Sequence, residues 1–349
     1  MMKAVYVTKV FDPQTQAPGE VACLEVPTPE VVGADDILIR VAFSALCGSD
    51  AHFIKDNLFA FEPPFAVGHE FSGTVADLGP AAQAQGFKTG DAVCGNFVLE
   101  CGFCDACREG KRQFCENATA NPAAQAEYIV LKANQVYPVP PGVSLLEAAL
   151  IEPFTIAAGA IDKAGIKLGQ SVFVSGAGSI GQMIVQLAKL NGASFVVTSA
   201  RTQSKRELAL TLGADRVIDP VHEDVLTLAR ELPGGGFDVV IEASGNLECA
   251  ALALDSVGVG GTVVYMSYYP PGRPVAIKLF EQIVVRELTV CGLQLSQNNW
   301  PRALRMFPRI DVKPLITNIY RLEDAPAAYA ELIAGKALKL VFDCQGGTA

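Results

Sequence analysis

The feature of this sequence that most constrains its fold is an alternation of strand and helix patterns that begins after residue 170. Apolar strand patterns at 172–175, 195–199, 216–218 and 237–242 are separated by helix patterns at 179–191, 204–212 and 222–231. Strands that alternate with helices in this way form a parallel sheet with helices on both faces. The alternation therefore predicts an α/β domain with a doubly wound sheet.

A glycine-rich turn follows the first of these strands and precedes its helix. Gly176, Gly178 and Gly181 match the dinucleotide-binding pattern, in which they permit a tight turn, close approach to a pyrophosphate and packing of helix on strand. Ser179 and Ile180 begin the helix, whose N-terminus offers N–H groups to the phosphates. A glycine turn without a ligand is the alternative, but the position between strand and helix favours a nicotinamide dinucleotide site.

The end of the second strand bears on the choice of cofactor. An NAD site needs an acidic side chain about 20 residues after the glycines, where it binds the adenosine ribose hydroxyls. This chain instead has Ser199, Ala200 and Arg201, followed by Lys205 and Arg206. A guanidinium and a second cation, from Lys205 or Arg206, suit a 2′-phosphate. The turn therefore favours NADP(H), with NAD(H) as second choice. The alternative is that these basic residues form a solvated turn that binds no phosphate.

A second domain is expected before residue 155. The chain has 349 residues, more than the ~250–300 at which a single core stops growing. Upstream of 155, short apolar runs such as 37–41 lie between turn residues, which is typical of an irregular β-rich domain. The sequence therefore predicts a β-rich domain followed by the α/β domain.

Charge and hydropathy exclude two classes of partner. The net charge of −10 disfavours nucleic acid and anionic membranes. The run 168–188 carries no formal charge, but its glycine, glutamine and serine residues argue against a membrane helix. We expect that run to be a buried strand leading into a helix, and the partner to be a small molecule.

Four closely spaced cysteines predict a metal-binding lobe at about 94–118. Cys101, Cys104, Cys107 and Cys115 have a spacing that can wrap one loop around one tetrahedral Zn²⁺. The first residues read as a strand rather than a signal peptide, so we expect a cytoplasmic protein whose clustered thiols bind metal instead of forming disulfides. An iron–sulfur cluster is the chemical alternative.

Two of the three histidines lie in short motifs suited to metal or proton chemistry, at 47–52 and 68–70. The candidate catalytic residues are Cys47, Ser49, His52, His69, Glu70 and Glu152. A catalytic zinc needs about three protein ligands and one open position. Each residue alone could be an ordinary core residue, but together, ahead of a dinucleotide fold, they predict a zinc enzyme.

In these motifs the chain resembles, nearly end to end, the zinc-dependent medium-chain dehydrogenases/reductases, nearest the sorbitol (polyol) and threonine dehydrogenase branch. The resemblance rests on 47–52, 68–70, 90–91, 101–115, 152–153, 176–181 and 313–317. It implies a GroES-like catalytic domain built from 1–155 and 296–349, and a Rossmann domain at 156–295.

The resemblance also implies a metal chemistry. Cys47, His69 and either Glu70 or Glu152 would hold a catalytic zinc, and the cysteine lobe would hold a structural zinc. The catalytic ion would stabilise an alkoxide while a hydride passes between the nicotinamide and the carbinol carbon.

Cofactor contacts follow from the resemblance as well. The residue matching Ile180 packs against the nicotinamide, and backbone near Met266 and Leu293 holds its carboxamide. A base at the position of Lys339 meets the pyrophosphate. We therefore expect Ile180, Met266, Leu293 and Lys339 to line the cofactor site in the folded chain.

Two residues of the first histidine motif are candidates for proton transfer. Ser49 can accept the alcohol proton and His52 can return it to solvent.

Leu295 stands where polyol dehydrogenases carry an arginine, and a leucine cannot donate hydrogen bonds to substrate hydroxyls. The run 121–128 departs from the family's usual Asp-Gly-Gly-aromatic-Ala-Glu-Tyr. We expect a less polar secondary alcohol or its ketone, in a pocket near Ser49, Phe53, Phe59, Phe97, Phe154 and Leu295.

Three other functions are compatible with the fold. One is oxidation of a 3-hydroxy amino acid, as in threonine dehydrogenases. A zinc-free enone or quinone reductase and a structural or cofactor-sensing protein are the others, and neither needs an intact zinc set.

The apolar strand at 288–293 could pair with a second subunit, so a homodimer or homotetramer is expected.

Overall fold

The computed structural model describes residues 1–56, 61–269, 272–296 and 298–347. The chain divides into two compact units. The first comprises Met1–Pro153, Leu304–Pro308 and Val312–Ala349, and the second comprises Phe154–Ala303 and Arg309–Asp311. The chain returns to the first unit at Leu304 rather than at 296. Residues before that point stay with the second unit, where the side-chain amide of Asn299 donates to the carbonyl of Thr155 at 2.8 Å.

The second unit contains a parallel sheet, whose strands in the described chain have the order β13-β12-β11-β14-β15-β16. These strands are β11 (Ser171–Ser175), β12 (Phe195–Ser199), β13 (Arg216–Ile218), β14 (Phe237–Glu242), β15 (Val257–Tyr265) and β16 (Thr289–Gly292). The order reverses between β11 and β14, which is where α/β sheets bind ligands. The predicted parallel α/β sheet is confirmed.

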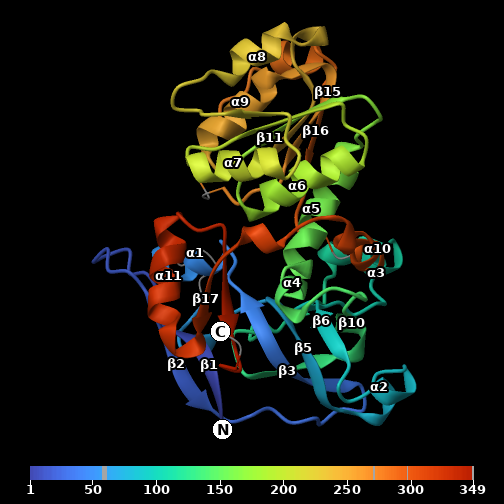
Figure 1. Ribbon diagram of the computed structural model, residues 1–349, viewed down its shortest axis with the longest axis vertical. Helices are drawn as coiled ribbons and strands as arrows, with labels where there is room; N and C mark the ends of the chain where they lie inside the picture. The colour runs from blue at the N-terminus through green and yellow to red at the C-terminus, as the bar shows by residue number, and fades with distance from the viewer. Residues whose placement is uncertain (57–60, 270–271, 297, 348–349) are drawn as a thin grey trace. The chain divides into compact units, whose positions relative to one another are not determined.

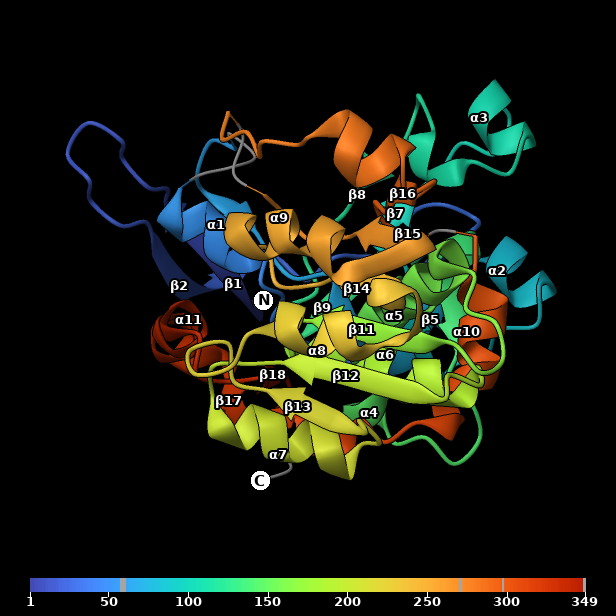
Figure 2. The same cartoon turned by 90° about the horizontal axis from the view of Figure 1, so that it is seen from above.

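Four helices connect successive strands from β11 to β15, namely α6 (Ser179–Leu190), α7 (Gln203–Thr211), α8 (Val225–Glu231) and α9 (Leu247–Ser256). Helix α5 (Ile151–Ala164) precedes β11, and α10 (Trp300–Met306) follows β16. Right-handed crossovers place α6 and α7 on one face of the sheet and α8 and α9 on the other. Figure 2 shows β12 and β13 side by side, with α7 next to β13. Helix α8 begins three residues later than predicted, because Asp224 caps it by accepting from the N–H of Leu226 at 3.0 Å.

The first unit is β-rich. Its three-stranded sheet and its two-stranded sheet contain β1 (Met2–Lys9), β2 (Glu20–Val26), β4 (Phe65–Ala66), β7 (Val98–Leu99) and β8 (Thr119–Ala120). Its largest sheet contains β3 (Asp36–Ala45), β5 (Glu70–Leu78), β6 (Ala92–Gly95), β9 (Tyr128–Lys132), β10 (Val136–Pro138), β17 (Ile316–Arg321) and β18 (Lys339–Asp343). Its helices are α1 (Asp50–Lys55), α2 (Pro80–Ala84), α3 (Asp105–Arg108), α4 (Leu145–Ala148) and α11 (Ala325–Ala334).

Strand β3 is the centre of the largest sheet. Ile37, Ile39 and Val41 are fully buried and alternate with more exposed residues such as Arg40, as expected of a strand with one face in the core. On one side β3 pairs with β5, and on the other it pairs with the C-terminal strand β18 (Figure 1). The C-terminal segment is therefore part of the first unit's core.

The uncharged run at 168–188 lies in β11 and α6, as the sequence predicts. Among the described residues, no helix is both long enough and apolar enough to cross a membrane.

Candidate active site and metal centres

The four lobe cysteines converge around α3. The Sγ atom of Cys101 lies 4.0 Å from that of Cys107 and 3.5 Å from that of Cys115, and the Sγ atoms of Cys104 and Cys115 are 3.9 Å apart. Four thiolates ~2.3 Å from one zinc ion stand ~3.8 Å apart in a tetrahedron, whereas a disulfide needs ~2.0 Å. The geometry fits a single tetrahedral ion better than a multi-iron cluster, which would hold the sulfurs farther apart.

Backbone N–H groups support thiolates in this lobe. The N–H of Cys104 donates to Cys101 Sγ at 3.4 Å, and the N–H of Cys101 donates to Cys115 Sγ at 3.3 Å. Burial raises the pKa of Cys101, but N–H donors from Cys104 and Phe103 outweigh it and lower that pKa to about 6. Because the thiolate is the form that binds metal, the lobe is suited to a cation.

A second cluster brings together Cys47, His69 and Glu70, whose candidate ligand atoms all lie within 4.8 Å of one another. Cys47 follows β3, and His69 directly precedes β5, which begins at Glu70. Since β3 and β5 pair with Ala45 opposite Glu70, the strand register brings the two sequence motifs together. The structure thus joins residues that the sequence offers separately.

Buried negative charge surrounds His69. Burial raises the pKa of Glu152 to about 7, an effect that His69 reduces and Glu70 increases. Burial also lowers the pKa of His69, but the charges of Cys47, Asp50 and Glu152 outweigh it and hold that pKa well above its usual range. A divalent cation would neutralise such a set of donors, so the residues fit zinc.

Lys339 lies in the same cluster. Its Nζ donates to the two carboxylate oxygens of Glu70 at 2.7 and 2.5 Å and to the carbonyl of Leu46 at 3.0 Å. Both side chains of the ion pair are almost fully buried. Lys339 reaches Glu70 because β18, which it begins, pairs with β3. Its contact with a pyrophosphate stays a prediction.

Three buried residues that the sequence did not predict as site residues lie behind the cluster. The carboxylate of Asp50 accepts from the N–H of Cys47 at 3.0 Å and from the side-chain amide of Gln125 at 3.1 Å. Gln125 in turn accepts from the hydroxyl of Tyr329 at 3.0 Å. Asp50 lies within a sequence motif, but nothing local to Gln125 or Tyr329 indicated this contact.

The candidate proton-transfer residues lie at the start of α1. Ser49 occupies its N-cap position, and His52 lies one turn further along. The Nδ1 atom of His52 is 2.8 Å from the carboxylate of Asp56, and the ring is partly exposed. The imidazole therefore has access to solvent, which a proton exit requires.

The glycine-rich turn has the geometry of a dinucleotide loop. Gly176 has a φ of 105°, and a Cβ on Gly181 would lie 2.0 Å from the carbonyl oxygen of Gly176. Apart from the adjoining residues of its own chain, no atom of the described residues lies within 4 Å of the position of a Cβ on Gly178, which therefore borders open space at the N-terminus of α6. No side chain in the described part of the chain caps that helix end, so the first-turn N–H groups, beginning with Ser179 and Ile180, can face a phosphate.

The basic turn after β12 contains one cation that is already engaged. Arg206 donates to the carbonyls of Ala200 and Arg201 at 2.6 and 2.9 Å and pairs with Asp219 at 2.9 Å. Arg206 therefore already holds the turn together, which favours Lys205 over Arg206 as the second cation for a phosphate. Burial, and then the charge of the exposed Arg201, lower the pKa of Lys205. The charges of Arg201 and Lys205 therefore act on each other across this turn.

The positions expected to hold the nicotinamide lie at the same sheet edge. Met266 and Leu293 directly follow β15 and β16, and their N–H groups donate to the carbonyls of Glu242 and Tyr265 at 3.3 and 2.9 Å. Ser199 ends β12 and Gly176 follows β11. The carboxyl edge of a doubly wound sheet is where such cofactors bind.

The expected substrate-pocket residues have different environments. The ring of Phe97 lies 4.8 Å from that of His69, beside the second cluster. Phe53 is buried against Phe65 in the core of the first unit, which argues against a role as a substrate contact. Phe154 is fully buried, and Leu295 has a φ of 51°, which is uncommon for a side chain of its size. Phe59 lies outside the described residues.

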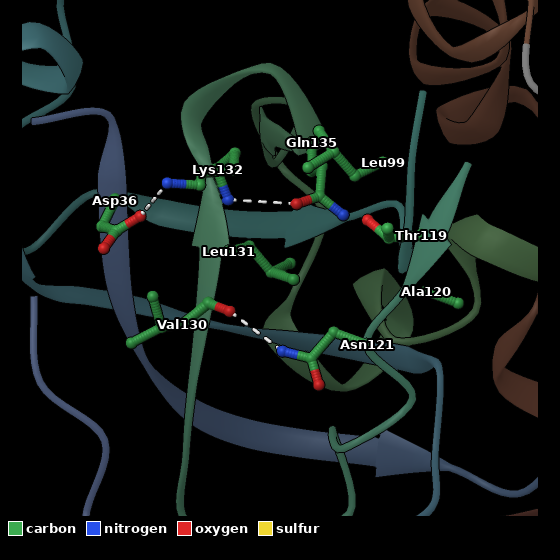
Figure 3. Close-up of a pocket in the computed structure, with 9 residues that line it drawn as sticks. All are labelled: Asp36, Leu99, Thr119, Ala120, Asn121, Val130, Leu131, Lys132 and Gln135. Atoms are coloured by element: carbon green, nitrogen blue, oxygen red, sulfur yellow. Dashed lines mark hydrogen bonds and ion pairs between the residues drawn. The ribbon is translucent and has the colours of Figure 1, made fainter. Parts of the chain in front are cut away.

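A separate pocket of about 170 Å³ lies at the exit of the cysteine lobe (Figure 3). Within it the ammonium of Lys132 pairs with Asp36 at 2.7 Å, and the amide of Asn121 donates to the carbonyl of Val130 at 3.1 Å. These polar groups satisfy one another, and none belongs to the two cysteine-containing clusters. We interpret this pocket as structural.

Comparisons with known proteins agree with this geometry. Residues 33–141 match the alcohol dehydrogenase GroES-like domain, and residues 179–309 match the zinc-binding dehydrogenase domain. An L-threonine 3-dehydrogenase from Chromobacterium violaceum is 31% identical over 94% of this chain and 97% of its own length.

Two solved structures are similar over nearly the whole chain. One, from Clostridium scindens and assigned to the zinc-binding dehydrogenases, has a TM-score of 0.93 and 33% identity, and the match covers 98% of this chain and 99% of that one. The other, from Sinorhizobium meliloti and assigned likewise, is bound to NADP. It has a TM-score of 0.87 and 31% identity, over 98% of this chain and 99% of that one.

Proposed function

The chain belongs to the zinc-dependent medium-chain dehydrogenase/reductase family, and from this premise we propose that it transfers a hydride between NADP(H) and a secondary alcohol or its ketone. One observation carries the proposal most strongly. The ligand atoms of Cys47, His69 and Glu70 lie within 4.8 Å of one another in a chain that also has an open glycine turn at a parallel sheet edge. A zinc-free reductase or a structural protein has no need of that cluster.

The metal-binding roles follow from the two clusters. Cys47, His69 and a carboxylate from Glu70 or Glu152 would hold the catalytic ion, and the four lobe cysteines would hold the structural one. When bound, zinc supplies Lewis acidity and the nicotinamide supplies the hydride acceptor. Around them Ser49 would accept the substrate proton, and His52 would pass it to solvent.

The preference for NADP(H) rests on the turn after β12. Ala200 leaves that turn without the carboxylate that binds ribose hydroxyls in NAD sites. Arg201 and Lys205 present two neighbouring cations, and two cations that repel each other gain from a shared phosphate. The NADP bound to the similar Sinorhizobium protein supports the same choice.

Two substrate classes remain in competition. Leu295 cannot donate a hydrogen bond, and Phe97 places an aromatic face beside His69, which favours a less polar secondary alcohol. A 3-hydroxy amino acid is the second candidate, because a curated relative with 31% identity is an L-threonine 3-dehydrogenase. The test is a panel of secondary alcohols, diols, polyols and L-threonine, with NADP⁺ and NAD⁺ reduction followed by absorbance. Cofactor reduction by none of them would contradict the proposed function.

We also propose that the protein is a homo-oligomer assembled through the edge strand β16. Beside this strand, the second unit exposes large apolar side chains between 277 and 290, among them Leu279, Phe280, Val284 and Val285. An apolar surface next to an unpaired strand edge favours self-association. Phe280→Asp should shift the molar mass measured by light scattering towards the monomer, and an unchanged mass would place the interface elsewhere.

A further inference from the structure

We propose that Gln125 is a positioning residue of the catalytic metal site, acting through Asp50 on His69 and Cys47. The inference rests on the proposed zinc-dependent function. It assigns a role to a glutamine in the run 121–128, where the chain departs from the family pattern.

A buried chain of hydrogen bonds connects helix α11 with the metal cluster. The Tyr329 hydroxyl donates to Gln125 Oε1 at 3.0 Å, and Gln125 Nε2 donates to Asp50 Oδ2 at 3.1 Å. The same Oδ2 accepts from the N–H of Cys47 at 3.0 Å. Tyr329, Gln125 and Asp50 are each at most 1% exposed, so water does not compete for these bonds.

The orientation of the amide is determined by its two neighbours. An ionised carboxylate only accepts hydrogen bonds, so the NH₂ group of Gln125 must face Asp50 and its oxygen must face the hydroxyl of Tyr329. With Oδ2 of Asp50 held by Gln125 and by the N–H of Cys47, the carboxylate cannot rotate freely. The glutamine therefore fixes where the other carboxylate oxygen points.

That other oxygen is directed at His69. Oδ1 of Asp50 is buried and has no hydrogen-bond partner among the described residues, and it lies 3.7 Å from Nδ1 of His69. A carboxylate at Nδ1 selects the tautomer whose Nε2 is free to bind a metal and raises the basicity of the ring. A shift of less than an ångström, roughly the excess over a normal hydrogen-bond length, would complete the contact.

The backbone is shaped to hold this glutamine. Gln125 donates its N–H to the carbonyl of Val67 at 3.0 Å and accepts from the N–H of Val5 at 2.8 Å. Gly68, next to His69, has a φ of 97°, and a Cβ there would lie 2.4 Å from Cγ of Gln125. The turn that presents His69 therefore has room for the Gln125 side chain only because it contains glycine.

The test is zinc retention in the Gln125→Leu variant. Zinc released from the full-length protein to a chromogenic chelator is followed over time, together with kcat and the KM for NADP⁺. We expect about 10- to 100-fold weaker binding of one zinc per chain, a lower kcat and an unchanged KM for NADP⁺. The lobe zinc should be released as in wild type. The matched control is Gln135→Leu, which removes a buried glutamine that donates to the carbonyl of Asn96 elsewhere in the first unit.

Tyr329→Phe keeps the ring and removes only the hydroxyl that orients the amide. We expect zinc binding in the same site to weaken by roughly twofold to tenfold. In the double variant with Gln125→Leu the two losses should add up to less than their sum, because both residues belong to one chain of hydrogen bonds.

If both single variants retain both zinc ions as wild type does, Gln125 is only a core residue and the inference is overturned. Wild-type protein that binds zinc in the lobe alone would instead contradict the proposed function. If Gln125→Leu does not fold, the Tyr329→Phe result decides.

Discussion

Lys339 and Glu70 form a buried ion pair at the metal cluster, with the lysine Nζ 2.5 Å from one carboxylate oxygen and 2.7 Å from the other. The pair links β18, near the end of the chain, to β5, the strand that begins directly after His69, and so helps to hold the C-terminal segment in the first unit.

 The contact explains why a strand from the far end of the sequence belongs to this site.

Replacing Lys339 with Met should destabilise the protein. Glu70 would then be a buried carboxylate without its cation, and removing one partner of a buried ion pair costs about 3–5 kcal/mol. The free energy of unfolding, measured by urea denaturation of the zinc-loaded protein, should fall by that amount. Adding Glu70→Gln should restore part of the loss. Unchanged stability would show that Glu70 is neutralised by another group.

The cysteine lobe should matter for stability more than for chemistry. Its four Sγ atoms leave no open coordination position for a substrate, so Cys107→Ser should remove one zinc and lower the melting temperature. The fraction that stays folded should keep a kcat close to wild type. A variant with full zinc content and unchanged melting would contradict a structural role for the lobe.

Cofactor preference should depend on two neighbouring residues. Arg201→Ala removes a charge-assisted contact and should weaken NADP⁺ binding at least about tenfold while leaving NAD⁺ binding nearly unchanged. Ala200→Asp should shift the preference towards NAD⁺, because a carboxylate accepts from ribose hydroxyls and repels a 2′-phosphate. The measurement is kcat/KM with both cofactors. If wild type prefers NAD⁺, Arg201 is only a solvated surface residue.

Local sequence patterns were sufficient to predict the second unit's strands and helices from β11 to β14, but not α9 or β15. The strands at 195–199, 216–218 and 237–242 have the predicted bounds, because each is a short apolar run bounded by turn residues. The glycine turn was equally predictable, since Gly176 needs a positive φ and Gly181 tolerates no Cβ. Helix α8 begins later than its pattern, because capping by Asp224 rather than periodicity determines where it starts.

The surroundings of the metal cluster could not be read from local patterns. Tyr329 and Gln125 are 204 residues apart, and Lys339 and Glu70 are 269 residues apart. Both contacts arise because the C-terminal segment returns to the first unit, which only tertiary structure specifies. Arg206 was an equally plausible phosphate ligand until its bonds to Ala200 and Asp219 were visible.

The most direct test of the central claim is the zinc dependence of cofactor reduction. With the best substrate from the panel, NADP⁺ reduction is measured before chelation, after removal of the zinc ion that is released first, and after zinc is added back. We predict that activity is lost with that one ion and returns with it. In His69→Ala it should be absent throughout, although NADP⁺ still binds. Activity that survives chelation, or that persists in His69→Ala, would contradict the zinc mechanism.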